Sequence, residues 1–123
     1  DNILLKSYSD DINIEYSASD IIITRAGALA LSEISLFNKP MIIVPIPCSF
    51  SNHQFINAKY FENKGAALVV EENAIKLIIK YIHKLKESTK LIKDMERNSK
   101  KISYPNASKD IIKVIEKIII KHV

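Results

Sequence analysis

Several residue types are scarce in this chain of 123 residues, which holds one cysteine, two glycines, no tryptophan and two arginines against 16 lysines. A single cysteine, Cys48, excludes an internal disulfide framework and a multi-cysteine zinc site, and favours the reducing cytoplasm. Because nucleic-acid readers depend on bidentate arginine contacts, the shortage of arginine argues against a nucleic-acid partner.

Long apolar runs are lacking too. The longest, 41–50, is interrupted by Pro45 and Pro47 and falls far short of the roughly 20 residues of a membrane-spanning helix. No signal-peptide pattern is visible. Position 1 is Asp rather than an initiator Met, which favours a piece of a longer chain or a processed one. With 47% hydrophobic and 26% charged residues, the composition is that of one globular domain.

Charge is distributed unevenly along the chain. Residues 1–72 carry five basic and nine acidic side chains, a net charge of −4, whereas residues 73–123 carry thirteen basic and five acidic ones, a net charge of +8. Such a basic part can face an anionic membrane. The lysines recur at helical spacing, which favours the simpler alternative of solvated helix faces.

The first two-thirds of the chain alternates short apolar runs with amphipathic stretches. Strands are predicted at Ile3–Leu5, 21–24, 41–44 and 68–70, and helices over 28–37 and from an N-cap at Ser51 to about Lys64, with Gly65 as the residue after the helix. This alternation predicts an α/β fold with a Rossmann-like parallel sheet flanked by helices and right-handed crossovers.

The last third is predicted to be a helical extension, with helices over 73–86, 89–99 and 107–122. In the last of these, Ile111, Ile112, Ile115, Ile118 and Ile119 form one apolar stripe between lysines. We expect this stripe to pack on the sheet or on a neighbouring domain, and a membrane surface is the alternative.

The most informative segment runs from Ser19 to Glu33. A buried strand ends in a turn at Gly27 and opens directly into a helix, which places backbone N–H groups and the positive end of the helix dipole at the carboxyl edge of the sheet. Such a site suits a phosphate or diphosphate, and Glu33 then lies within reach of ribose hydroxyls. The alternatives are an ordinary strand-to-helix turn and a surface glutamate.

A second segment, Pro45 to Asn57, leaves the next strand at the same edge. His53, Gln54 and Asn57 carry neutral hydrogen-bonding groups that suit sugar hydroxyls, although helix capping is an alternative role for this region. Cys48 has no paired motif around it, His83 and His122 lie among lysines, and no metal-binding or nucleophile motif is present.

Taken together, ASDIIITRAGALALSEISLFNKPMIIVPIP and NHQFINAKYFENKGAALVV resemble the C-terminal domain of the MurG family. Members of this family are bacterial UDP-N-acetylglucosamine (UDP-GlcNAc) transferases of peptidoglycan synthesis. The resemblance spans residues 3–72 well and the later helices more loosely. It implies the C-terminal half of a GT-B glycosyltransferase, which inverts the sugar linkage as it moves N-acetylglucosamine to the C4 hydroxyl of an undecaprenyl-linked muramyl-pentapeptide.

The resemblance also implies a role for each matching position. Tyr8 and Ser9 would hold uracil, Glu33 the ribose, and Gly27, Ala28 and Leu29 the diphosphate. Gln54 and Asn57, with His53 beside them, would lie near the donor sugar, and Arg25 would have a structural or phosphate-directed role. Ala30 replaces the family's threonine, and Asn38 replaces a glycine at a position where asparagine tolerates a left-handed backbone.

The resemblance covers only the donor half of such an enzyme. We therefore expect residues 1–123 to be part of the donor domain, with the acceptor domain, its general base and any catalytic residue outside this chain. No cofactor or metal is expected, and the place of action would be the inner face of the cytoplasmic membrane. Two alternatives remain open: a stand-alone donor-binding subunit with a membrane-anchored acceptor partner, and an inactive nucleotide-sugar-binding remnant.

Overall fold

The computed structural model describes residues 2–47 and 52–121 of the chain. Cys48, Ser51 and His122 lie outside the described residues, so the expectations for the Cys48 and His122 side chains are not tested. The elements, in chain order, are α1 (Ile12–Ala18), β1 (Ile22–Thr24), α2 (Ala28–Leu36), β2 (Met41–Ile43), α3 (His53–Asn63), β3 (Ala67–Val69), the 3-10 turn η2 (Glu72–Ala74), α4 (Leu77–Glu87), α5 (Thr89–Ile102) and α6 (Ala107–Lys121).

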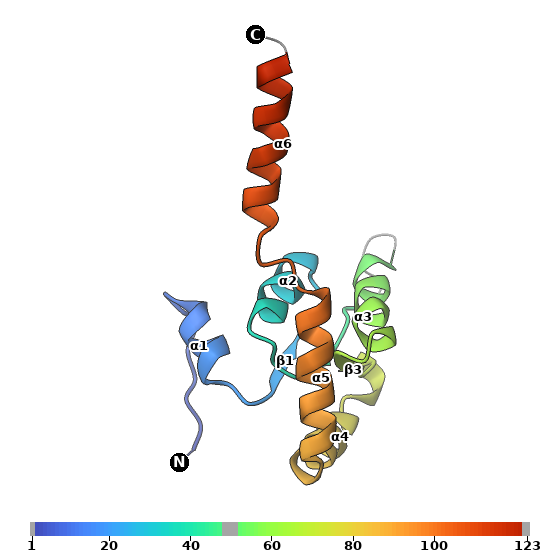
Figure 1. Cartoon of the computed structure of the whole chain (residues 1–123). Coiled ribbons are helices and arrows are strands. Elements are labelled where there is room, and N and C mark those ends of the chain that lie inside the picture. Colours follow the sequence, from blue (N-terminus) through green and yellow to red (C-terminus); the bar gives the residue numbers. More distant parts are fainter. Residues whose placement is uncertain (1, 48–51, 122–123) are drawn as a thin grey trace.

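The three strands form one parallel sheet in the order β1-β2-β3, as the alternation of strands and helices predicts. Side chains alternate between the two faces of β2, so Met41 and Ile43 join Leu31 and Phe61 of α2 and α3 in one core cluster. Ile42 and Val44 point to the other face, where the second cluster includes Leu85 of α4 and Met95 of α5. Both faces of the sheet are therefore covered by helices, which confirms the predicted α/β fold (Figure 1).

Two predicted backbone details are confirmed. Asn38, which ends the turn after α2, has a left-handed φ of 54°, and Gly65, which follows α3, has a φ of 69°. Both residue types adopt this conformation at low cost, so they end their helices where the sequence predicts. At the other end of α3, the N-cap is Asn52, with a φ of 58°, so the predicted start of this helix is wrong by one residue.

The N-terminal segment differs from expectation in two ways. Ile3–Leu5 is not a strand but extended, exposed chain, since no described strand lies beside it to share backbone hydrogen bonds. Helix α1 was not predicted, although the Asp11 side chain accepts a hydrogen bond from the backbone N–H of Asn13 at its start. Tyr16 fastens α1 to the end of α2 through a tilted ring contact with Phe37, 5.5 Å between centroids.

Several boundaries also move, three of them as follows. Strand β3 begins at Ala67, one residue earlier than predicted, although the N–H of Val70 still donates to the carbonyl of Ile43. Helix α4 begins at Leu77 rather than at residue 73, because a 3-10 turn closed by the Ala74 N–H and the Glu71 carbonyl comes first. Helix α5 is longer than predicted and ends at Ile102.

Helix α6 projects away from the rest of the molecule after the turn at Tyr104 and Pro105 (Figure 1). All of its described residues are exposed, including the predicted isoleucine stripe. The stripe therefore does not pack on the sheet, because α2 and α3 on one face and α4 and α5 on the other already cover the sheet. Packing on a neighbouring domain, the other half of the expectation, stays a prediction. None of the described helices is both long and apolar enough to cross a membrane.

Candidate functional site

The candidate site lies at the carboxyl edge of the sheet, where β1 ends and α2 begins. The first hydrogen bond of α2 joins the Leu31 N–H to the Gly27 carbonyl at 3.0 Å, so the N–H groups of Ala28, Leu29 and Ala30 precede the helical ladder. No side chain from the described residues caps this end of the helix. These N–H groups can donate hydrogen bonds to an anion, and the helix dipole favours negative charge at the same place. This is the role that the sequence predicts for the turn.

Gly27 at this turn has a backbone that any residue could adopt, with φ −65° and ψ 131°. A Cβ built on Gly27 would meet nothing within 4 Å. The protein itself therefore does not require a glycine here, whereas a ligand that approaches the backbone closely would.

Two side chains of α3 hold the residue before Gly27. The Gln54 Oε1 accepts hydrogen bonds from the backbone N–H of Ala26 at 3.2 Å and of Ile46 at 3.0 Å. The Asn57 Nδ2 donates to the Ala26 carbonyl at 3.0 Å. The structure thus brings Gln54 and Asn57 to the start of α2, and their spacing of three residues places both on one side of α3.

Arg25 links the end of β1 to the segments that follow β2 and β3 at the same edge of the sheet. Its guanidinium makes a two-point ion pair with the Glu72 carboxylate, at 3.0 and 3.1 Å, and also donates to the Val44 carbonyl at 3.3 Å. The hydrogen bond lowers the pKa of Glu72 and raises that of Arg25, which keeps both charged. No motif in the sequence marks Glu72, although its place in the turn after the third strand puts it at the same edge as Arg25.

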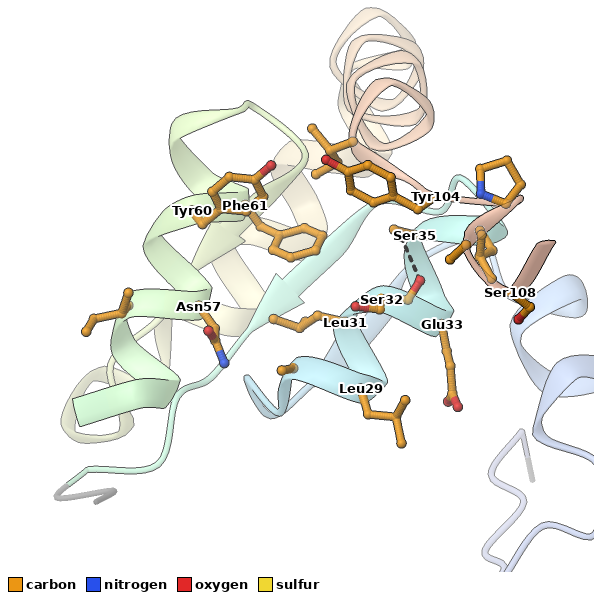
Figure 2. A pocket seen from close by; sticks show the side chains of 16 residues that line it. Leu29, Leu31, Ser32, Glu33, Ser35, Asn57, Tyr60, Phe61, Tyr104 and Ser108 are labelled. Atoms are coloured by element: carbon orange, nitrogen blue, oxygen red, sulfur yellow. Dashed lines mark hydrogen bonds between the residues drawn. The ribbon is translucent and has the colours of Figure 1, made fainter. Parts of the chain in front are cut away.

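Glu33 lies farther along α2, on the side that faces α1. Its carboxylate adds to burial in raising the pKa of Tyr16 on α1. Leu29 and Glu33 project from the same side of α2 (Figure 2), as a spacing of four residues requires.

The remaining predicted site residues are Tyr8, Ser9 and His53. Tyr8 is 80% exposed in the segment before α1, and the Ser9 hydroxyl donates to Glu15. His53, the first residue of α3, is exposed. No interaction recorded for the described residues joins Tyr8 or Ser9 to the start of α2.

A groove of about 740 Å³ runs between α2 and α3 toward the turn before α6. Four predicted site residues, Ala28, Leu29, Glu33 and Asn57, line it, and Tyr104 lies on its far side (Figure 2). Its volume falls in the range of small-molecule sites. Among the described residues, no group of three or more His, Cys, Asp or Glu side chains is placed to hold a metal ion.

Most of the chain matches one protein-family model. The model of the glycosyltransferase family 28 C-terminal domain matches residues 1–115. The chain belongs to this family. The MurG-like character that the motifs indicate is therefore confirmed, and with it the fold class.

Two curated relatives carry the name UDP-N-acetylglucosamine--N-acetylmuramyl-(pentapeptide) pyrophosphoryl-undecaprenol N-acetylglucosamine transferase. The one from Wolbachia sp. subsp. Brugia malayi is 36% identical over 113 residues, 90% of this chain and 33% of the relative. The one from Caldicellulosiruptor saccharolyticus is 40% identical over 117 residues, 94% of this chain and 32% of the relative. This family member thus spans about a third of the length of the curated relatives it matches.

A solved structure has the same fold. The crystal structure of Acinetobacter baumannii MurG superposes with a TM-score of 0.78 at 27% sequence identity, covering 89% of this chain and 32% of that one.

Proposed function

We propose that this chain is the donor-binding part of an inverting glycosyltransferase. It would bind UDP-GlcNAc for transfer to the C4 hydroxyl of an undecaprenyl-diphosphate-linked N-acetylmuramyl-pentapeptide in peptidoglycan synthesis. The observation that carries the proposal is the gathering of family-motif residues around the start of α2: Arg25, Gly27, Ala28, Leu29, Gln54 and Asn57. Family membership and the names of the relatives support it.

The diphosphate would lie at the start of α2. The N–H groups of Gly27, Ala28 and Leu29 and the helix dipole favour negative charge there. The open space where Gly27 lacks a Cβ lets a phosphate approach the backbone closely. Since Arg25 is paired with Glu72, we assign it a structural role at this edge.

The uridine would extend from the diphosphate toward α1. Glu33 lies five residues beyond Ala28, a rise of roughly 7–8 Å along the helix, which matches the reach from a diphosphate to ribose hydroxyls. Its position on the α1 side of α2 is consistent with uracil held by Tyr8 and the backbone of Ser9.

The N-acetylglucosamine would lie on the opposite side, toward the start of α3. His53, Gln54 and Asn57 all belong to this end of the helix. Imidazole and amide groups can both donate and accept hydrogen bonds, which suits sugar hydroxyls.

The acceptor and the general base would come from a further domain or a separate subunit, so no catalytic residue is assigned to this chain. We propose that residues 1–123 are the donor part of a longer enzyme, because the relatives are about three times as long. A lipid-linked acceptor would place the enzyme at the inner face of the cytoplasmic membrane. The lysines of α6 and its exposed isoleucine stripe suit contact with an anionic bilayer.

An NMR titration with UDP-GlcNAc and with UDP tests the proposal. The amides of Ser9, Gly27, Ala28 and Leu29 are expected to shift, and Glu33→Ala to weaken the response to both ligands by roughly tenfold, as loss of a charged hydrogen-bond partner does. Glu87→Ala, which removes an exposed carboxylate on α4, is the control and should leave the response unchanged. A folded chain whose amides stay still at millimolar UDP would refute donor binding by this chain.

A further inference from the structure

Ala26, the residue before the proposed diphosphate site, has both of its backbone polar groups held by side chains. It is fully buried, with an exposed fraction of 0%. Its N–H donates to Gln54 and its carbonyl accepts from Asn57. Because β1 ends at Thr24, the sheet no longer supplies partners here, and these two amides satisfy a buried peptide that would otherwise lack them.

Gln54 links this turn to the neighbouring loop as well. The same Oε1 atom accepts from the Ile46 N–H, so a single oxygen holds the loop after β1 and the loop after β2. A carbonyl oxygen has two lone pairs and can accept both bonds at once. Gln54 therefore helps to fix the relative position of the two loops, together with the bond from Arg25 to the Val44 carbonyl.

We propose that Gln54 and Asn57 are positioning residues that hold Ala26, so that the N–H groups at the start of α2 converge on one anion. The inference rests on the proposed function and deepens it. It gives the two amides a role at the diphosphate end of the donor, in addition to the place near the sugar that the family resemblance implies. Convergent backbone N–H groups bind an anion well only if the turn that carries them is already ordered.

The two roles differ in which ligand they affect. A side chain that only contacts the sugar changes the affinity for UDP-GlcNAc and leaves that for UDP unchanged. A side chain that orders the diphosphate turn changes both affinities by the same factor. UDP, which lacks the sugar, therefore separates the roles.

Gln54→Met tests this, because methionine has a similar shape but cannot accept the two bonds. We expect amide hydrogen exchange at Ala26 and Ile46 to accelerate, and the affinities for UDP and UDP-GlcNAc to fall together by roughly tenfold, as loss of buried partners does. Gln54→Glu keeps an acceptor at this position and should restore slow exchange at both amides. Unchanged UDP affinity with weakened UDP-GlcNAc affinity would overturn the positioning role in favour of sugar contact.

Asn57→Leu is the second variant, should Gln54→Met fail to fold. It removes the amide donor facing the Ala26 carbonyl at nearly the same shape, adds no charge beside the diphosphate, and should weaken both ligands equally. Asn63→Leu makes the same change at the exposed end of α3 and is the matched control. If the unmodified chain binds neither nucleotide, donor binding fails; exchange at Ala26 and Ile46 then shows only whether the two amides order the turn.

Discussion

The start of α2 and helix α6 use polar side chains in opposite ways. At the start of α2, hydrogen bonds connect residues 28, 31 and 47 positions apart in the chain. In α6, the ion pair between Lys113 and Asp110 spans three positions within one helix, and the isoleucines face solvent. The first region is fixed by the tertiary structure, whereas α6 is regular on its own and has an apolar face that the described residues leave uncovered.

The largest expected effect is a difference in unfolding free energy between a substitution in the core and one in α6. Leu31 is fully buried under the sheet, whereas Ile115 of α6 is 49% exposed. Leu31→Ala should lower the free energy of unfolding by about 2–5 kcal/mol, because it leaves a cavity, and Ile115→Ala should change it by less than about 0.5 kcal/mol. Urea unfolding followed by circular dichroism measures both. Equal losses would mean that the α6 stripe is covered in solution.

A smaller effect on stability is expected when each of the two glycines is replaced by alanine. Gly65 has a φ of 69°, and an added Cβ would lie 2.8 Å from the Asn98 Nδ2, so Gly65→Ala should cost roughly 1–2 kcal/mol of unfolding free energy. Gly27→Ala should leave stability within about 0.5 kcal/mol and weaken UDP binding, because its Cβ meets only the ligand. Thermal unfolding measures the stability of both variants, and a UDP titration measures their affinity for UDP. If Gly27→Ala bound UDP with full affinity, the proposal that the diphosphate lies at this turn would be wrong.

The third prediction concerns the lysines of α6. The chain should sediment with vesicles that contain anionic lipid and not with neutral ones. Lys113→Gln combined with Lys117→Gln should weaken this association by roughly thirtyfold, because each lysine near the surface contributes about 1 kcal/mol. The pair Lys84→Gln and Lys86→Gln on α4 removes the same charge elsewhere. Equal weakening by both pairs would indicate attraction by overall charge rather than by α6.

The smallest effect is the pH dependence of the Arg25–Glu72 pair. Arg25 lowers the pKa of Glu72 below the ordinary value of 4.5, so this pair stabilises the fold above that pH and loses its contribution as the pH falls through the lowered pKa. The melting temperature of Glu72→Gln should therefore lie slightly below that of the unmodified chain at pH 7 and converge with it in acid. Both side chains are partly exposed, so the difference is small. A difference that persists unchanged at low pH would contradict the role of charge.

Local sequence patterns determined most elements of this protein. Strands β1 and β2 and helices α2, α3 and α6 follow from runs of β-branched residues, helical spacing and the residues that end helices, such as Asn38 and Gly65. These signals act over a few residues, so one chain is enough to read them. The start of α2 as an anion site also follows from a strand that leads directly into a helix.

Only the tertiary structure decided which residues hold that site together. Ile3–Leu5 has the composition of a strand, but none of the described strands lies beside it. The 3-10 turn at Glu72 brings that carboxylate to Arg25. The bonds from Gln54 and Asn57 to Ala26 join segments that no local pattern pairs. The sequence by itself determined where the chain turns and which faces are apolar, whereas packing determined which buried backbone groups need a partner and which side chain supplies it.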